Sequence, residues 1–400
     1  MHVFLNGLAA SAGGGLTYLR NVIPELSNRL DIKATIVLSS DLRRKFEPSS
    51  NISYITLNST MGAAGRFWRE QFLLGRLIEE SGADVLISAG NFALRHSPVP
   101  QILLSGNSLY TSRDFVSDLR SRREYLLLLD TFGKQIFAKR SILWADCTVA
   151  PSTAFAKELK RWTGINVKTI HHGFDHERFH HSAESLSSDL RLRLDAPHDT
   201  LLLLFVSHYN YYRNFETLLR AIPIIQQRLG TRPVKLLLTC KFESEKNPGA
   251  YKSNAAAALV DKLNIADHVL QLGAVPYEAL AGLYALSHIY VTPAYTETFA
   301  HPLVEAMASG LPVVASDIPV HREVCGGAAV YFERFSHEEL AKQVVQLAGS
   351  NDLRQSLIGL GLPRSRDFSW HNHVDQILAL ARDLQMRAPA RRNAITRRIG

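Results

Sequence analysis

Apolar residues follow two alternating patterns along this chain. Short apolar runs such as Leu201–Val206 predict strands that are buried on both faces. Between these runs, apolar residues return every three or four positions, as in Phe215–Leu229, which predicts helices with one apolar face. Strands that alternate with helices in this way indicate an α/β fold with parallel sheets.

The alternation occurs in two series of similar size, separated by a polar stretch rich in Ser, His and Asp. Two series of this kind predict two doubly wound domains, and ligands of such sheets bind beyond the carboxyl ends of the strands. Strands are expected at 2–7, 34–40, 52–58, 84–90, 101–106, 147–152 and 167–173, then at 201–207, 234–240, 268–275, 288–294, 312–317 and 328–333. The expected division is a first domain at 1–175, a connection at 176–199, a second domain at 200–365, a C-terminal helix at 366–386 and a disordered basic tail at 387–400.

Composition narrows the class of protein. A hydrophobic fraction of 46% and a charged fraction of 20% are ordinary for a globular protein. The three cysteines are far apart and form no CxxC pair, which argues against a disulfide framework or a zinc knuckle. No apolar run approaches the roughly 20 residues of a spanning helix, and the start of the chain lacks a signal-peptide pattern. We therefore expect a cytoplasmic protein.

The net charge of +8 is unevenly placed. Residues 1–185 carry 22 Lys and Arg against 17 Asp and Glu, whereas residues 186–386 carry 18 against 20. The last stretch, RAPARRNAITRRIG, adds five arginines and no acid. It is either a solvated end or a contact for an anionic surface. No motif that reads a nucleic-acid groove accompanies it, so nucleic acid is not an expected partner.

The stretch ETFAHPLVE carries two carboxylates eight positions apart, Glu297 and Glu305. Pro302 and Gly310 are typical of the first turn and the end of a helix. The loop before Pro302 then presents backbone N–H groups at the positive end of a helix dipole, which suits a diphosphate. Ionised carboxylates accept hydroxyl hydrogens, so the two glutamates can clamp a sugar and a ribose. The alternative for Glu305 is a favourable acid in a first helical turn. The loop residues are Thr298, Phe299, Ala300 and His301.

The wider stretch Tyr295–Ser316, YTETFAHPLVEAMASGLPVVAS, resembles the donor-binding signature of retaining glycosyltransferases of family 4, also called glycosyl transferases group 1. The resemblance extends from Leu272 to Phe332. This large family includes relatives of sucrose and trehalose-phosphate synthases. The resemblance implies a GT-B fold, in which two Rossmann-like domains face each other across a cleft.

A second family-like segment is FVSHYNYYRN, at Phe205–Asn214. The family usually has Gly-Arg and then Lys-Asn here, whereas this chain has Ser207, His208 and Arg213. The resemblance implies that Arg213 neutralises the donor diphosphate, a role that suits a permanently charged, bidentate guanidinium. Ser207 and His208 are candidate donor-binding residues, and the alternative for His208 is an ordinary polar loop residue.

Two features of the first domain belong to the same resemblance. Gly14 and Gly15, in ASAGGG, stand where the family loop approaches the donor phosphates and the acceptor. Asn107 stands near the position where many members have a histidine that contacts the donor sugar. We take Asn107 with Glu297 and Arg213 as the candidate catalytic residues, and rank His96 below Asn107. His172 is expected to be structural.

The resemblance implies transfer of a sugar, with retention of configuration, from a nucleotide diphosphate sugar such as a UDP- or GDP-sugar. No DxD-type metal site is seen, so we expect a metal-independent enzyme without a cofactor. The acceptor is expected to be a glycan or a polyprenyl-linked glycan in bacterial surface polysaccharide synthesis. The alternatives are a non-catalytic sugar-nucleotide binding protein and a glycoside hydrolase or phosphorylase.

Two basic and apolar helical stretches in the first domain, at residues 66–76 and 120–140, suggest contact with anionic lipid. The alternative is ordinary amphipathic packing with a solvated face. On the first interpretation the protein is peripheral at the inner membrane face.

Overall fold

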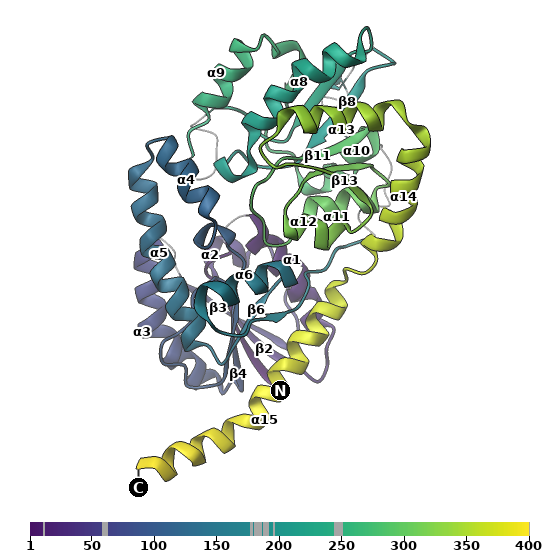
Figure 1. Ribbon diagram of the computed structural model, residues 1–400. Coiled ribbons are helices and arrows are strands. Elements are labelled where there is room, and N and C mark those ends of the chain that lie inside the picture. Colours follow the sequence, from purple (N-terminus) through teal and green to yellow (C-terminus); the bar gives the residue numbers. More distant parts are fainter. Residues whose placement is uncertain are drawn as a thin grey trace. The chain divides into compact units, whose positions relative to one another are not determined.

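The computed structural model describes residues 1–10, 13–57, 63–176, 179, 186, 192–194, 197–243 and 251–399, without the side chains of residues 13, 63, 64 and 388–399. These residues form two compact units (Figure 1). Unit 1 comprises Met1–Thr111, Leu129–Gly173 and Ser369–Gly400, and unit 2 comprises Ser112–Leu128 and Phe174–Phe368. Most of the expected connection at 176–199 lies outside the described residues, so that expectation stays a prediction.

Unit 1 is built on a sheet in the order β3-β2-β1-β4-β5-β6-β7, with every pairing parallel. The chain moves outward from β1 in one direction and then, from β4, in the other. This reversal places a topological switch point between β1 and β4, where doubly wound sheets bind ligands. The strands are β1 (His2–Asn6), β2 (Lys33–Ser39), β3 (Ile52–Leu57), β4 (Val85–Ser88), β5 (Gln101–Leu104), β6 (Cys147–Ala150) and β7 (Lys168–Thr169).

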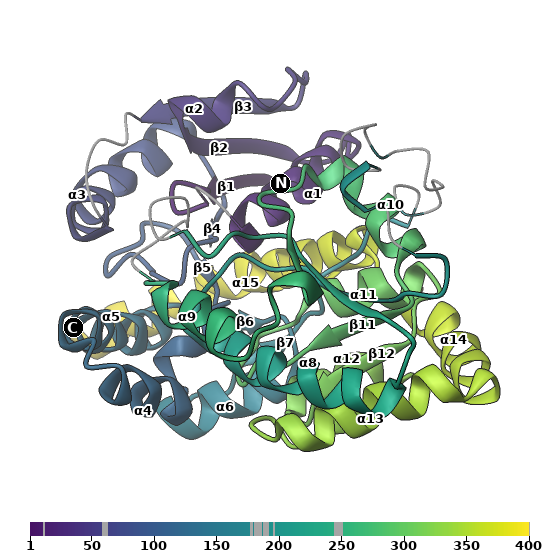
Figure 2. The same cartoon turned by 90° about the horizontal axis from the view of Figure 1, so that it is seen from above.

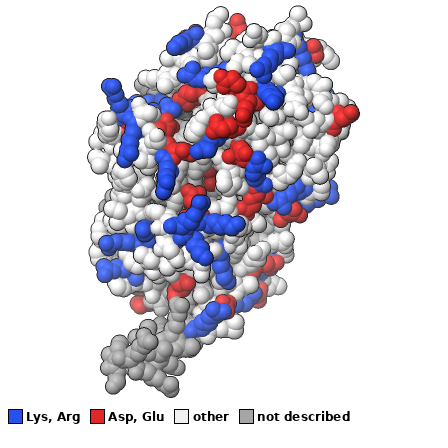
Figure 3. All heavy atoms as spheres, viewed as in Figure 1, with Lys and Arg blue, Asp and Glu red and all other residues white. Residues whose placement is uncertain are grey.

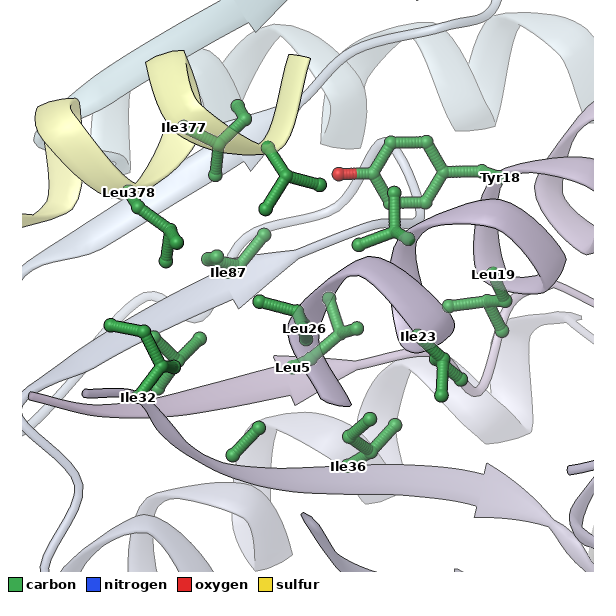
Figure 4. Close-up of a cluster of buried hydrophobic side chains, with 14 of the residues drawn as sticks. Leu5, Tyr18, Leu19, Ile23, Leu26, Ile32, Ile36, Ile87, Ile377 and Leu378 are labelled. Atoms are coloured by element: carbon green, nitrogen blue, oxygen red, sulfur yellow. The ribbon is translucent and has the colours of Figure 1, made fainter. Parts of the chain in front are cut away.

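The largest core cluster of unit 1 joins both ends of the sequence (Figure 4). Leu5, Ile36 and Ile87 point from three strands toward helix α1 (Gly13–Ser27). Ile377 and Leu378 of α15 (Trp370–Ile399) close the same cluster. The remaining helices of the unit are α2 (Ser40–Arg43), α3 (Ala63–Ser81), α5 (Tyr125–Trp144), which begins in the segment counted with unit 2, and α6 (Thr153–Thr163).

Unit 2 is built on a second parallel sheet in the order β10-β9-β8-β11-β12-β13. Its switch point lies between β8 and β11. The strands are β8 (Leu201–Phe205), β9 (Val234–Leu238), β10 (Val269–Gln271), β11 (Ile289–Thr292), β12 (Val313–Ser316) and β13 (Ala329–Phe332). Its helices are α4 (Arg113–Ser121), α8 (Phe215–Leu229), α9 (Asn254–Lys262), α10 (Tyr277–Leu286), α11 (His301–Ala308), α12 (Pro319–Cys325), α13 (His337–Gly349) and α14 (Asn351–Ser365).

The predicted α/β class with parallel sheets is confirmed, and each predicted strand is present. Helices α2, α4, α12 and α14 were not predicted. In α14 the glycines and Pro363 interrupt the apolar periodicity, so the sequence pattern is weak. The helix forms because it packs against α11, where Gly361 lies against Met307.

The two units differ from the expected domain boundaries in two segments. Residues Ser112–Leu128, expected in the first domain, belong to unit 2 because their polar side chains find partners there. The chain from Ser369 onward returns to unit 1 because α15 completes its core. Helix α15 was expected within 366–386 and has the bounds Trp370–Ile399. The expected disorder of the basic tail at 387–400 stays a prediction.

Within the described residues, no helix combines the length and the apolar character that crossing a membrane requires.

Candidate functional site

An ion pair between Arg213 and Glu297 lies at the switch point of unit 2. Arg213 ends the short 3-10 helix Tyr211–Arg213 after β8, and Glu297 follows β11. Because β8 and β11 are neighbours in the sheet, their carboxyl ends bring the two loops together. The Nη1 of Arg213 donates to Oε1 of Glu297, whose side chain is buried. The structure thus joins two of the three predicted catalytic residues.

Three hydrogen bonds fix the loops that carry this pair. The backbone N–H of Tyr295 donates to the carbonyl oxygen of Tyr212 at 3.0 Å. Asn214 adopts a left-handed conformation with φ 54°, and its Nδ2 donates to the Pro293 carbonyl at 3.2 Å. A third bond runs from the Ser316 hydroxyl to the carbonyl oxygen of Ala294. The pair is therefore held by backbone as well as by charge.

The guanidinium of Arg213 keeps further donor capacity. Its Nε–H is buried and has no hydrogen-bond partner among the described residues. A buried donor without an acceptor is costly in a folded protein unless a ligand or water satisfies it. The group is thus suited to an anion that enters beside Glu297.

Helix α11 begins as predicted, and its entry is strained. Ala300 precedes the helix with φ 65° and ψ 63°, a left-handed conformation that is uncommon for a residue with a side chain. Pro302 lies in the first turn, and Gly310 follows the helix with φ 65°. Phe299 is buried, with ring centroids 5.2 Å from Phe368 and 5.0 Å from His301. These contacts hold Thr298–His301 at the amino end of the helix.

Glu305 lies one turn inside α11 and is 5% exposed. Its Oε2 accepts a hydrogen bond of 2.7 Å from the hydroxyl of Tyr284, a partner that sequence analysis missed. Burial raises the pKa of Glu305 to about 7, although the Tyr284 hydroxyl opposes that rise. A carboxyl with this pKa changes charge near neutral pH, as a group that meets a polar ligand can.

Ser207 and His208 begin the loop that leads to Arg213. The Ser207 N–H donates to Thr239 Oγ1 at 2.9 Å, and the Ser207 hydroxyl donates to the carbonyl of His208 at 2.7 Å. The side chain of His208 is only partly covered by the protein. Partial burial and the Arg213 charge lower the pKa of His208, so it is mainly neutral at pH 7.

The other predicted residues lie in unit 1. Gly14 and Gly15 are in the first turn of α1, where a side chain on Gly15 would come within 3.0 Å of the Ala10 backbone. Asn107 caps a short 3-10 helix, and its Oδ1 accepts the Leu109 N–H at 3.0 Å. This cap accounts for the presence of an asparagine at position 107 in the local structure. The catalytic role of Asn107 stays a prediction. Likewise His172 packs on Trp370 with ring centroids 5.5 Å apart, in line with a structural role.

His321 is a further buried residue near the ion pair that sequence analysis did not single out. Its Nδ1 bonds to the Ser316 carbonyl oxygen at 3.0 Å, and its Nε2 is buried without a partner among the described residues. Burial, with the nearby Arg213 charge, lowers the pKa of His321 to about 4. The imidazole is therefore neutral, and it supports the strand end next to the Glu297 loop. The feature of the sequence that could have pointed to His321 is the motif HREV, which follows a predicted strand.

Side chains of helix α4 contact the loops of unit 2 that carry Arg213 and Glu297. Tyr295 donates its hydroxyl to Asp118 Oδ2 at 2.8 Å. Arg122 bridges Asp118 and Glu216 with hydrogen bonds of 2.7 and 2.8 Å. Its guanidinium also lies 4.3 Å from the ring centroid of Tyr211. The network ties α4 to the segments on either side of the Arg213–Glu297 pair.

Among the described residues, no group of three or more His, Cys, Asp or Glu side chains is arranged to hold a metal ion.

Family models match both halves of the chain. The model described as Glycosyl transferases group 1 matches residues 188–359, and the model described as Glycosyltransferase Family 4 matches residues 12–178. Among curated proteins, O-antigen chain mannosyltransferase B of Escherichia coli is 33% identical over 107 residues, covering 27% of this chain and 28% of that protein. D-inositol 3-phosphate glycosyltransferase of Thermobifida fusca is 27% identical over 246 residues, covering 60% and 55%. The chain thus spans between about a quarter and about half of the length of these relatives.

Solved structures share the fold over nearly the whole chain. Sucrose-phosphate synthase from Thermosynechococcus elongatus superposes with a TM-score of 0.78 at 19% identity, covering 96% of this chain and 99% of that one. Anabaena HepE, solved in complex with UDP-glucose, has a TM-score of 0.71 at 16% identity, covering 96% and 100%. The two family models and this shared architecture agree with the strand order of both units. The chain belongs to the glycosyltransferases of the group 1 and family 4 type, which have the GT-B fold.

Proposed function

We propose that this chain transfers a sugar from a nucleotide diphosphate sugar to an acceptor hydroxyl, with retention of the anomeric configuration. The observation that carries the proposal is the Arg213–Glu297 pair at the carboxyl ends of β8 and β11, next to the loop that enters α11. This arrangement offers a cation, a carboxylate and helix-terminal amides at one edge of one sheet.

Arg213 and the amino end of α11 act on the leaving group. As the bond between the sugar C1 and the diphosphate oxygen breaks, negative charge grows on the diphosphate. The guanidinium can keep Glu297 on Nη1 while its unpaired Nε–H turns to a phosphate oxygen. The amides of Thr298–His301 add the positive end of the helix dipole.

The two glutamates orient the donor. Glu297 accepts hydrogen bonds from hydroxyl groups of the sugar, and Glu305 accepts from the ribose. The acceptor oxygen bonds to C1 on the face from which the diphosphate leaves, and its proton passes to the departing phosphate oxygen. No enzyme base is required, so positioning and charge stabilisation supply the catalysis.

The names of the relatives guide the choice of substrates. HepE was solved with UDP-glucose, and the Escherichia coli relative is named as a mannosyltransferase of the O-antigen chain. We therefore propose a UDP- or GDP-sugar as donor and a glycan or polyprenyl-linked glycan as acceptor. Bacterial surface polysaccharide synthesis at the inner membrane face is the setting that these substrates suit. The reaction is proposed to need no metal and no cofactor.

The proposal is tested by measuring nucleotide release from a panel of UDP-, GDP-, ADP- and dTDP-sugars without acceptor. Slow hydrolysis of one donor, lost in Arg213→Ala and Glu305→Ala, is the expected result. Arg232→Ala is the matched control, because Arg232 lies just before β9, at the opposite end of the strands, and should leave hydrolysis unchanged. Hydrolysis that persists in both site variants would contradict the assignment.

Further measurements separate the alternatives. Calorimetric binding of a donor without turnover, even with a range of glycan acceptors, would indicate a non-catalytic binding protein. Release of sugar from glycosides that lack a nucleotide would indicate a hydrolase. Once an acceptor is found, proton NMR of the product should show the donor's anomeric configuration, and EDTA should leave the rate unchanged.

A further inference from the structure

The outer face of helix α5 in unit 1 is apolar although it is open to solvent. Leu129, Ile136 and Leu143 are 67%, 58% and 54% exposed, and Phe132 is exposed with them. Spacings of three, four and seven residues place these four side chains in one stripe along the helix. Single exposed apolar residues are common in soluble proteins, but a continuous stripe marks a surface that contacts something.

The stripe is not needed to hold α5 in the fold. The opposite face of the helix is already buried, through residues such as Ala138 and Ile142. Ile142 belongs to a core cluster with Leu103 of β5 and Phe155 of α6. The outer stripe therefore has no packing role within unit 1.

Basic side chains border the stripe. At 100° per residue, Lys139 and Arg140 lie on opposite sides of the line through Ile136 and Leu143. Both are exposed. The nearby acid Asp130 is already paired with Lys134 at 2.5 Å. Over the side of the molecule where α5 lies in Figure 1, Figure 3 shows mostly uncharged surface interrupted by Lys and Arg.

Helix α3 extends this surface. Both helices lie on the same side of unit 1 in Figure 2, and the rings of Phe67 in α3 and Phe137 in α5 meet with centroids 4.8 Å apart. Trp68 and Phe72 stack with centroids 6.2 Å apart, and Phe72 is 80% exposed. Arg69 is exposed next to them. Aromatic rings and arginines beside aliphatic side chains are typical of surfaces that enter the headgroup region of a membrane.

We propose that the outer faces of α5 and α3 form a docking surface for an anionic lipid bilayer. The aliphatic stripe and the Trp68–Phe72 pair enter the interface between headgroups and acyl chains. Lys139 and Arg140 pair with lipid phosphates. This inference concerns the surface of unit 1 and stands independently of the proposed donor chemistry in unit 2.

The test is co-sedimentation of the full chain with vesicles of phosphatidylcholine, with and without phosphatidylglycerol, at low salt. We expect binding to the anionic vesicles and release by added salt. The triple variant Leu129→Ser, Ile136→Ser, Leu143→Ser should weaken the partition at least about tenfold, because three buried aliphatic side chains are lost from the interface. Lys139→Glu with Arg140→Glu should weaken binding to anionic vesicles by a similar factor.

Two controls locate the effect on this surface. Leu30→Ser with Leu360→Ser removes leucines that are 96% and 50% exposed from other parts of the molecule and should leave the partition unchanged. Emission from Trp68 should shift to shorter wavelength on vesicle binding, and Trp68→Phe should abolish most of the shift. Donor hydrolysis without acceptor should be the same in all these variants. A negative result in the vesicle experiments would therefore leave the proposed function unaffected.

Other outcomes would overturn the inference. One is equal partition of the stripe variant and the leucine control. Another is the absence of any binding to anionic vesicles. A third is sedimentation as a dimer that the stripe variant dissociates, which would make a second copy of this chain the occupant of the surface.

Discussion

At the scale of single residues, burial sets the charge states that the candidate site uses. Arg213 stays charged because the guanidinium is permanently protonated and Glu297 lies against it. Glu305 and His321 are the reverse case, since burial favours the neutral form of each. The site thus holds one ion pair, one neutral imidazole and one carboxyl whose charge can change near neutral pH.

Two substitutions of Arg213 should distinguish the effect of its positive charge on donor hydrolysis from the effect of its planar shape. Arg213→Lys keeps the charge but loses the planar fork of N–H donors, so we expect donor hydrolysis to fall by about 10-fold to 100-fold. Arg213→Ala should cost about 100-fold to 1000-fold, the usual loss when one donor that stabilises a developing anion is removed. Measuring kcat of both variants with the identified donor tests whether Arg213→Ala loses more activity than Arg213→Lys. An equal loss of hydrolysis in the two variants would mean that the planar arrangement of N–H donors matters and the positive charge does not.

The pKa of Glu305 predicts how stability depends on pH. Its folded value of about 7 lies above the ordinary value of 4.5, so the folded state binds the extra proton between pH 4.5 and 7. The contribution of Glu305 to stability is therefore full below pH 4.5 and falls as pH rises to 7. Glu305→Gln, which stays neutral, should flatten this part of the curve of Tm against pH. An unchanged slope would show that other groups set it.

Donor binding should engage the same carboxyl. Ribose hydroxyls donate to the ionised form, so binding should lower the pKa of Glu305 and release a proton near pH 6.5. Calorimetry in two buffers of different ionisation enthalpy measures that proton. Glu305→Gln should bind without the release.

At the scale of elements, the position of α4 is the main departure from the sequence-based organisation. The sequence pattern did not predict this helix, and the segment was expected in the first domain. In the structure its charged residues anchor the helix to unit 2 through Asp118 and Arg122. The pairing makes α4 part of the support for the loops on either side of Arg213 and Glu297.

Tyr295→Phe should loosen α4 without changing the apolar packing of the ring. The change removes the 2.8 Å hydrogen bond to Asp118 and leaves a partly buried carboxylate with one partner fewer. We expect a loss of about 1–3 kcal/mol in the free energy of unfolding. Hydrogen exchange should rise in Arg113–Ser121. Tyr331→Phe, which removes a hydroxyl bonded to the Gly326 carbonyl, is the control and should leave α4 protected.

At the scale of the whole molecule, the last helix belongs to the first unit. Trp370 begins α15, is buried and packs edge-on to Tyr18 with ring centroids 5.8 Å apart. His373 bonds to the Tyr18 hydroxyl at 3.2 Å and to the carbonyl of His171 at 2.8 Å. Unit 1 is therefore completed by residues that follow the main segment of unit 2 in the sequence.

Trp370→Ala should destabilise unit 1 selectively. Removing a buried indole costs about 3–5 kcal/mol, including the cavity that it leaves. Hydrogen exchange should rise in β1 and β4, while β8 and β11 of unit 2 keep their protection. Val344→Ala in α13 is the converse control, since Val344 is fully buried in unit 2. Equal deprotection of both sheets by Trp370→Ala would mean that the two units unfold as one.

The sequence alone determined the strands, most helices and the family, because these depend on local periodicity and on contiguous motifs. It also singled out Arg213 and Glu297 as candidates, since each lies in a contiguous segment that resembles a motif of the family. Tertiary structure decided what depends on distant partners. Tyr284 opposite Glu305, Asp118 opposite Tyr295 and α15 on the first sheet join positions that no periodicity relates. Such pairings arise because buried polar groups and apolar faces must be satisfied in space, wherever their partners lie along the chain.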